Sequence, residues 1–317
     1  MRTWLLGALG ACAMLAWPAG AQPRLEDPEA HIVEELVVQA ALPGPAWWRV
    51  EDEDSTVYIL GVFDGRLPRG MTWDQRQLER RLKGANALIV GTRVSLNGGV
   101  RDLPALLRLR NRMRSKTPME ETLPASLRAR FVAARERIGQ PAKRYQDWSP
   151  LWAGQLLVQD AREGRAGEAA ETAVLRAARK LKVKSRDPAR YELRPFLESA
   201  TGSLTPTLNQ QCLSWALDDL EAPAGRARTA ARGWARGDVR AALQAPRSFE
   251  KCLLLLGGGA DLWRRATRDR AAAIEKALET PGHAVAIVGL RNLLAEGGVI
   301  AQLEARGLEV AGPRETD

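Results

Sequence analysis

The stretch AWWRVEDEDSTVYILGV, residues 46–62, decides the expected fold. Two runs rich in apolar and β-branched residues, near Trp48–Glu51 and Thr56–Val62, flank a polar turn, and this pattern predicts a β-hairpin. Three residues after Gly61, near the end of the second run, the chain carries Asp64. Polar side chains just past a buried strand of an α/β sheet often lie in a ligand site. Asp64 is therefore the first candidate functional residue.

Two later runs resemble the end of this hairpin. ALIVG ends at Gly91 and VAIVG ends at Gly289, and both look buried on two faces, as YILG does. We expect these three runs to lie side by side in one sheet. Between them, from about 102 to 278, the apolar spacing is almost wholly helical, with one short strand near Val183. The sequence therefore predicts an α/β fold: a mixed central sheet formed by strands from both ends of the chain, with a large helical insert.

The sequence carries several helix signals, most of them in the insert. Asp102 is expected to cap its first helix, with a proline in the first turn. The apolar periodicity predicts helices at Gln75–Lys83, Leu127–Ile138, Pro150–Arg162, Glu168–Leu181, Leu204–Leu220 and Asp261–Leu278. A last helix and strand follow the VAIVG run.

The N-terminus has the pattern of an export signal. MRTWLLGALGACAMLAWPAGAQ has Arg2, a short apolar stretch and an Ala-x-Ala site ending at Ala21, which is typical of a signal peptide over 1–21. We expect a periplasmic or secreted protein that begins at Gln22. The alternative is a lipoprotein, because LGAC is close to a lipid-attachment motif at Cys12.

The chain after the leader divides into three expected parts. We expect an N-terminal extension at 22–44, one domain at 45–312 and a short tail at 313–317. No segment after the leader is long and apolar enough to suggest a transmembrane helix.

Cysteine use fits an oxidising compartment. Removal of the leader would leave Cys212 and Cys252, and an even pair in an exported protein favours a disulfide. Two unpaired cysteines in the core are the alternative.

The composition indicates an ordinary globular protein, with 45% apolar and 27% charged residues. The net charge of +9 is spread along the chain, and no nucleic-acid-binding motif accompanies it, so we expect no nucleic-acid partner. The basic amphipathic stretch Leu106–Lys116 leaves binding to an anionic surface open as a further function.

Several segments together resemble one known family. They are WWRVEDEDSTVYILG, LERRLKGANALIV, WSPLWAGQLLV, RDRAAAIEKAL and VAIVGLRNLLAEGGVIAQLEARGLEV, spread over about 45–311. In these segments the chain resembles the TraB/GumN family, which includes the Tiki-type metalloproteases and is similar to the ChaN and erythromycin-esterase fold. The resemblance implies a divalent-metal site built from two Gly-x-x-His motifs and a glutamate, ligands that suit Mn, Co or Zn ions.

This chain keeps the glycines of those motifs and lacks the ligands. Asp64 follows Gly61 where the first histidine belongs, and Gly91 stands where the glutamate belongs. Asn292 follows Gly289 where the second histidine belongs. The two histidines of the chain outside these motifs do not restore the site, because His31 precedes the first strand and His283 begins the late one.

Two arginines are expected at the same edge. Arg93 and Arg291 follow two of the predicted strands, and their charge would repel a cation or pair with Asp64 and hold it ionised. The sequence thus favours a pseudoenzyme without a cofactor, with a vestigial pocket at Gly61, Asp64, Gly91, Arg93, Gly289, Arg291 and Asn292.

We expect such a protein to act by binding a peptide, another envelope protein or a small anion held between the two arginines. The alternative is a metal-dependent hydrolase or peptidase that uses a substituted site around Asp64 and Asn292.

Overall fold

The computed structural model describes residues 27–36, 44–91, 93–95, 103–223 and 225–313. The expected signal peptide, its lipoprotein alternative at Cys12 and the helix cap at Asp102 lie outside these residues.

The predicted hairpin is present. Strands β1 (Trp47–Glu51) and β2 (Ser55–Val62) pair antiparallel from Trp47↔Leu60 to Glu51↔Thr56. Asp52 closes the turn, because its Oδ1 accepts hydrogen bonds from the backbone N–H and the hydroxyl of Ser55, at 2.9 and 2.6 Å. The chain's last strand, β10 (Val310–Ala311), pairs antiparallel with β1 and forms one edge of the sheet.

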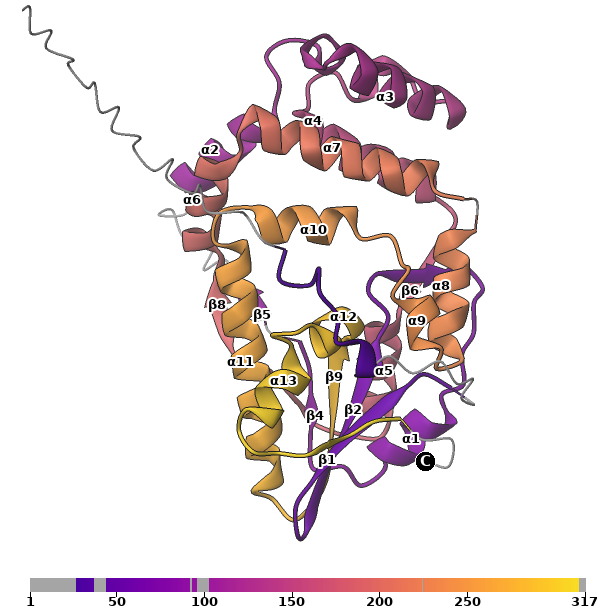
Figure 1. The fold of residues 1–317 in the computed structure, drawn as a ribbon, viewed down its shortest axis with the longest axis vertical. Coiled ribbons are helices and arrows are strands. Elements are labelled where there is room, and N and C mark those ends of the chain that lie inside the picture. The colour runs from indigo at the N-terminus through magenta and orange to yellow at the C-terminus, as the bar shows by residue number, and fades with distance from the viewer. Residues whose placement is uncertain (1–26, 37–43, 92, 96–102, 224, 314–317) are drawn as a thin grey trace, which may run out of the picture.

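Strands from the N-terminal and C-terminal parts of the chain pair in the middle of the sheet. Strand β9 (Gly282–Gly289) runs parallel to β2 along its whole length, from Ser55↔Gly282 to Val62↔Gly289. Strands β4 (Leu88–Ile89) and β7 (Ser185–Arg186) follow, which gives the order β10-β1-β2-β9-β4-β7 (Figure 1). The predicted mixed sheet, with its three buried runs side by side, is confirmed.

The third predicted strand is shorter than the apolar run suggests. After β4, the chain departs from the sheet, and β5 (Arg93–Ser95) pairs instead with β8 (Arg190–Glu192). A further pair joins β3 (Arg66–Pro68) to β6 (Ala166–Ala169). The sequence predicted β4 and β5 as one strand, NALIVGTRV from Asn86, and one further strand in the insert. It missed β3, β6 and β8, because they carry few of the apolar residues that mark a core strand.

Each of the six helices predicted by range is confirmed to within about two residues at either end. The structure adds α6, α8 and α9, which the sequence did not predict. The helices are α1 (Arg76–Leu82), α2 (Leu103–Met113), α3 (Ala125–Arg137), α4 (Pro150–Arg162), α5 (Ala170–Lys180), α6 (Leu193–Ser203), α7 (Pro206–Glu221), α8 (Arg226–Ala235), α9 (Val239–Ala242), α10 (Ser248–Leu255), α11 (Gly259–Leu278), α12 (Leu290–Leu294) and α13 (Val299–Glu304).

The helical insert forms a layer beyond the sheet. Helices α3, α4 and α7 lie at one end of the molecule and α10 lies between them and the sheet (Figure 1). A disulfide joins Cys212 in α7 to Cys252 in α10, with the two Cα atoms 5.7 Å apart, as the sequence predicted. Among the described residues, no helix has the length and apolar character needed to cross a membrane.

Gly61 is where β2 packs most closely on its surroundings. A Cβ atom at this position would lie 2.7 Å from Cδ1 of Leu290 and 2.8 Å from Cζ3 of Trp48, both of which are buried. The indole N–H of Trp234 also donates a 2.7 Å hydrogen bond to the Gly61 carbonyl. Only a residue without a side chain fits between these groups.

We predict that Gly61→Ala lowers the free energy of unfolding by about 1–3 kcal/mol, because the added methyl group overpacks the core. Urea denaturation measures this change. The control is Gly202→Ala in α6, where a Cβ atom meets nothing within 4 Å. That variant should be neutral or slightly more stable, and equal destabilisation of both would contradict the packing argument.

We predict that the double variant Cys212→Ala/Cys252→Ala loses up to about 4 kcal/mol of stability, since the bridge spans 40 residues and restricts the unfolded chain. Guanidinium denaturation with and without reductant measures the loss. Addition of reductant should destabilise the parent protein and leave the double variant unchanged. Insensitivity of the parent protein would show that the two thiols are not bonded in solution.

Candidate functional site

The strand register brings the ends of three strands to one edge. Val62 lies opposite Gly289, and Ile89 lies opposite Ala286, in neighbouring parallel strands. The residues just beyond these pairs therefore emerge together. They border a pocket of about 330 Å³ over an apolar floor, with the wall residues Asp64, Arg66, Gly91, Glu171, Arg270 and Gly289.

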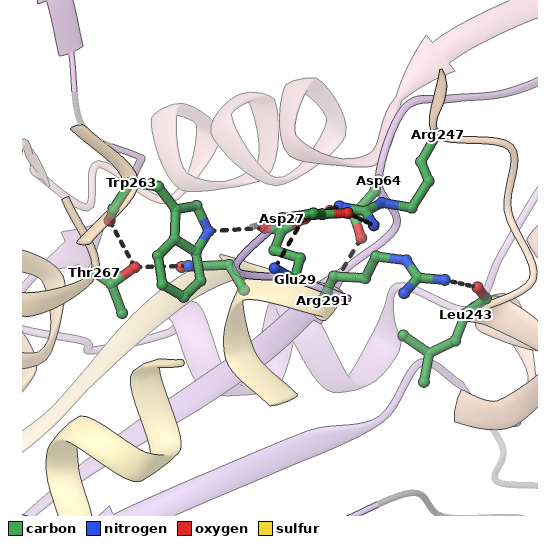
Figure 2. Close-up of polar contacts among 9 residues, drawn as sticks. Asp27, Glu29, Asp64, Leu243, Arg247, Trp263, Thr267 and Arg291 are labelled. Atoms are coloured by element: carbon green, nitrogen blue, oxygen red, sulfur yellow. Dashed lines mark hydrogen bonds and ion pairs between the residues drawn. The ribbon is translucent and has the colours of Figure 1, made fainter. Parts of the chain in front are cut away.

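Asp64 is held tightly against the backbone of the neighbouring strand. Its Oδ1 lies 2.6 Å from the position that a Cβ atom of Gly289 would occupy, so a side chain there would collide with the carboxyl group. Its Oδ2 accepts a 3.3 Å hydrogen bond from the backbone N–H of Arg291, at the start of α12 (Figure 2). The glycine is thus required for the position of the acid.

This environment disfavours the charged form of Asp64. Burial raises the pKa of its carboxyl to about 7, and the negative charge of Glu29 adds to the effect. The N–H of Arg291 opposes it by stabilising the carboxylate. The pocket therefore holds a carboxyl group that exchanges its proton near neutral pH.

The sequence did not predict the wall residues Arg66, Glu171 and Arg270, and Arg270, from α11, has the most informative contacts. Its Nη1 donates a 2.7 Å hydrogen bond to Oδ1 of Asn292, and its Nη2 lies 3.7 Å from where a Cβ atom of Gly91 would be. The amide nitrogen of Asn292 in turn donates a 2.7 Å bond to the hydroxyl of Thr267. One guanidinium group therefore reaches two of the three positions at which the resemblance implies metal ligands.

Asp64, Gly91 and Gly289 line the pocket, as predicted. Arg291 lies at the expected edge, but the prediction that it pairs with Asp64 through its side chain is wrong. Its guanidinium group donates instead to the carbonyl of Leu243, and only its backbone N–H reaches the acid (Figure 2). Among the described side chains, no guanidinium group is bonded to Asp64, and burial raises its pKa, so Arg291 does not hold it ionised as expected.

Two other predicted residues do not line the pocket, and the position of a third is described only for its backbone. Gly61 is inside the sheet and serves packing. Asn292 is buried and is not among the pocket-lining residues, but it accepts a hydrogen bond from Arg270, which is. The backbone of Arg93 belongs to β5, which leaves the central sheet, and its side chain is outside the described part of the structure.

The residues of the site do not suit the divalent ion that the resemblance implies. Both polar atoms of the Asn292 amide are already engaged, and a guanidinium group occupies the space beside it. Within the described ranges, no group of three His, Cys, Asp or Glu residues could hold a metal ion. A transition-metal site would need several deprotonated ligands acting together.

The same fold and site region are covered by a match to a known family. A sequence model of the TraB/PrgY/gumN family matches residues 46–311, most of the chain. The chain belongs to the TraB/PrgY/gumN family. The match includes all three strand ends that form the pocket of this family member. No curated protein and no solved structure matches the chain.

We predict that Asp64→Asn stabilises the protein above pH 7 by up to about 4 kcal/mol and leaves stability near pH 4 unchanged. In the folded protein the carboxyl keeps its proton up to about pH 7, whereas in the unfolded chain it loses the proton near the ordinary aspartate pKa of 3.8. The folded state therefore binds more protons between these values, so the free energy of unfolding falls as pH rises through them. The amide removes that loss.

Urea denaturation at several pH values tests this prediction, with Asp54→Asn in the exposed hairpin turn as the control. The gain should grow from pH 4 to pH 7 and then level off. Destabilisation by Asp64→Asn at pH 8 would show that the ionised carboxylate stabilises the fold.

Proposed function

We propose that this member of the TraB/PrgY/gumN family is an exported, non-catalytic binding protein in which the guanidinium group of Arg270 takes the place of the metal. The observation that carries the proposal is the position of that group, bonded to Asn292 and adjacent to Gly91. Export is supported by the leader-like first 21 residues and by the disulfide between α7 and α10.

A fixed cation at this place works against a bound metal ion. Arg270 attracts Asp64 electrostatically and stands beside the glycine that replaces the glutamate of the family pattern. Burial lowers the pKa of Arg270, yet a guanidinium group remains charged in proteins. Two like charges a few ångströms apart repel strongly in a partly buried site. The pocket therefore favours a ligand that brings negative charge to Arg270.

The pocket also has the chemistry to recognise a small anion. Nε of Arg270 is buried and lacks a hydrogen-bond partner among the described residues. Arg66 lies on the same wall, with its own Nε bonded to the carbonyl of Gly167. A protonated Asp64 can donate one further hydrogen bond. We infer that these groups bind a carboxylate or phosphate group of a small ligand.

The proposal predicts metal binding from defined substitutions. The unmodified protein should bind Mn²⁺, Co²⁺ and Zn²⁺ no more tightly than about 0.1 mM, whereas Asp64→His/Gly91→Glu/Asn292→His restores the ligand types of the family pattern. With Arg270 in place the triple variant should gain little. Adding Arg270→Gln should increase its affinity at least tenfold, because the repelling charge is gone. Calorimetry with each metal salt measures these affinities.

The matched control adds Arg66→Gln to the triple variant, which removes one positive charge from the same pocket but away from Asn292. It should leave metal affinity close to that of the triple variant. Tight, stoichiometric metal binding by the unmodified protein would overturn the proposal and favour a metal-dependent hydrolase acting through Asp64 and Asn292.

The anion-binding part has its own readout. Phosphate or acetate at millimolar concentration should raise the Tm of the unmodified protein and have a smaller effect on Arg270→Gln. Equal shifts in both proteins would show that the anion does not bind at Arg270.

A further inference from the structure

A segment ahead of the first strand packs against the end of α12, beside the site. Residues 27–36 run between α10 and α12 (Figure 1). The N–H of Val33 donates to the carbonyl of Leu294 at 3.0 Å, and the N–H of Glu296 donates to the carbonyl of His31 at 3.1 Å. Ile32 forms an antiparallel bridge with Ala295 between them. The segment is therefore fastened to the end of the same short helix whose start holds Asp64.

Two acids of this segment bind one arginine. Nη1 of Arg247 lies 2.7 Å from Asp27, and its Nη2 lies 2.9 Å from Glu29 (Figure 2). The three side chains are only 14%, 7% and 13% exposed, respectively. Glu29 also accepts a 3.0 Å hydrogen bond from the indole N–H of Trp263. This is a buried and well-satisfied ionic cluster, unlike the exposed pairs that contribute little to stability.

Three arginines surround Asp64, and each is bonded to another acceptor. Arg247 binds the two acids of the segment, Arg291 binds the carbonyl of Leu243, and Arg270 binds Asn292. All three are close enough to be attracted electrostatically by Asp64. Among the described residues, none of them forms an ion pair with its carboxyl group. Each of these guanidinium groups is thus directed at an acceptor other than Asp64.

We propose that residues 27–36 act as a charge clamp, in which Asp27 and Glu29 are positioning residues that hold Arg247 away from Asp64 and leave the Asp64 carboxyl group available to the pocket. The clamp acts on the site of the proposed function. Its readout is the titration of Asp64, which is independent of whether the protein binds a metal ion or an anion.

The charges around Asp64 set the expected direction of the effect. Glu29 and Glu250 raise its pKa, whereas Arg291 lowers it. Glu171 and Arg66 face the same pocket from α5 and β3. Loss of the two clamp acids would remove a nearby negative charge and also release Arg247 to pair with Asp64. Both changes favour the carboxylate form.

The test is a carboxyl NMR titration of the full chain with ¹³C-labelled aspartate, in which Asp64→Asn identifies the Asp64 signal. In Asp27→Asn/Glu29→Gln the pKa of Asp64 should fall by at least one unit from its value of about 7. The matched control is Glu34→Gln, which breaks an exposed pair with Arg240 on the same segment and should leave this pKa unchanged.

A second variant covers the case in which the double variant does not fold. Arg247→Gln leaves the two acids near Asp64 without their counterion, so the pKa of Asp64 should rise. A segment that only stabilised the fold, without acting on the charges around Asp64, would not shift the pKa of Asp64 in opposite directions in the two variants. An unchanged pKa in folded Asp27→Asn/Glu29→Gln, or an unchanged or lower pKa in Arg247→Gln, overturns the clamp and leaves the metal and anion results untouched.

Discussion

The parallel pairing of β2 with β9 is the contact on which the rest of the molecule depends. Both strands are buried on two faces, so their backbone groups must bond to each other or remain unsatisfied in the core. The pairing fixes the register of the sheet and places Asp64 against Gly289. It also aims the N–H of Arg291 at the carboxyl group. A shift of two residues along β9 would separate the acid from both partners.

The site is a balance of buried charges at the junction between the sheet and the helical insert. Charged groups in such a place need partners, because their loss of water is expensive. Arg247, Arg270 and Arg291 find these partners in the N-terminal segment, an asparagine side chain and a main-chain carbonyl. Among the described residues, Asp64 receives one long backbone hydrogen bond, and burial raises its pKa so that the neutral form is favoured up to about pH 7. Asp64 is therefore the member of this cluster whose charge state changes near neutral pH.

Much of the fold was predictable, because core strands and helices leave strong local patterns. The hairpin at 46–62 and the apolar run before Gly289 indicated the sheet, and regular apolar spacing located helices such as α4 and α11. The strands β3, β6 and β8 left no such pattern, since they are short and lie outside the central sheet.

The site was predictable only in part. The glycine-framed motifs pointed to Asp64, Gly91 and Gly289, because those positions follow the strands directly. Arg270 is one of several arginines along α11, and nothing in the sequence tells which of them faces the strand ends. The segment at 27–36 has no periodicity, and its place depends on ion pairs with Arg247, more than 200 residues away.

The separation of the two central strands also governs the order in which the protein can fold. The residues joined at the site are 227 positions apart, and β9 is among the last elements to be synthesised. Contacts between such distant residues form slowly, because closing the long loop between them costs conformational entropy before any contact energy is gained. Until then both edges of the future sheet centre stay open, and the growing chain cannot complete its core. If the protein is exported, as proposed above, a chain that still lacks β9 would be open enough to pass through a translocation channel, because its central sheet cannot yet close.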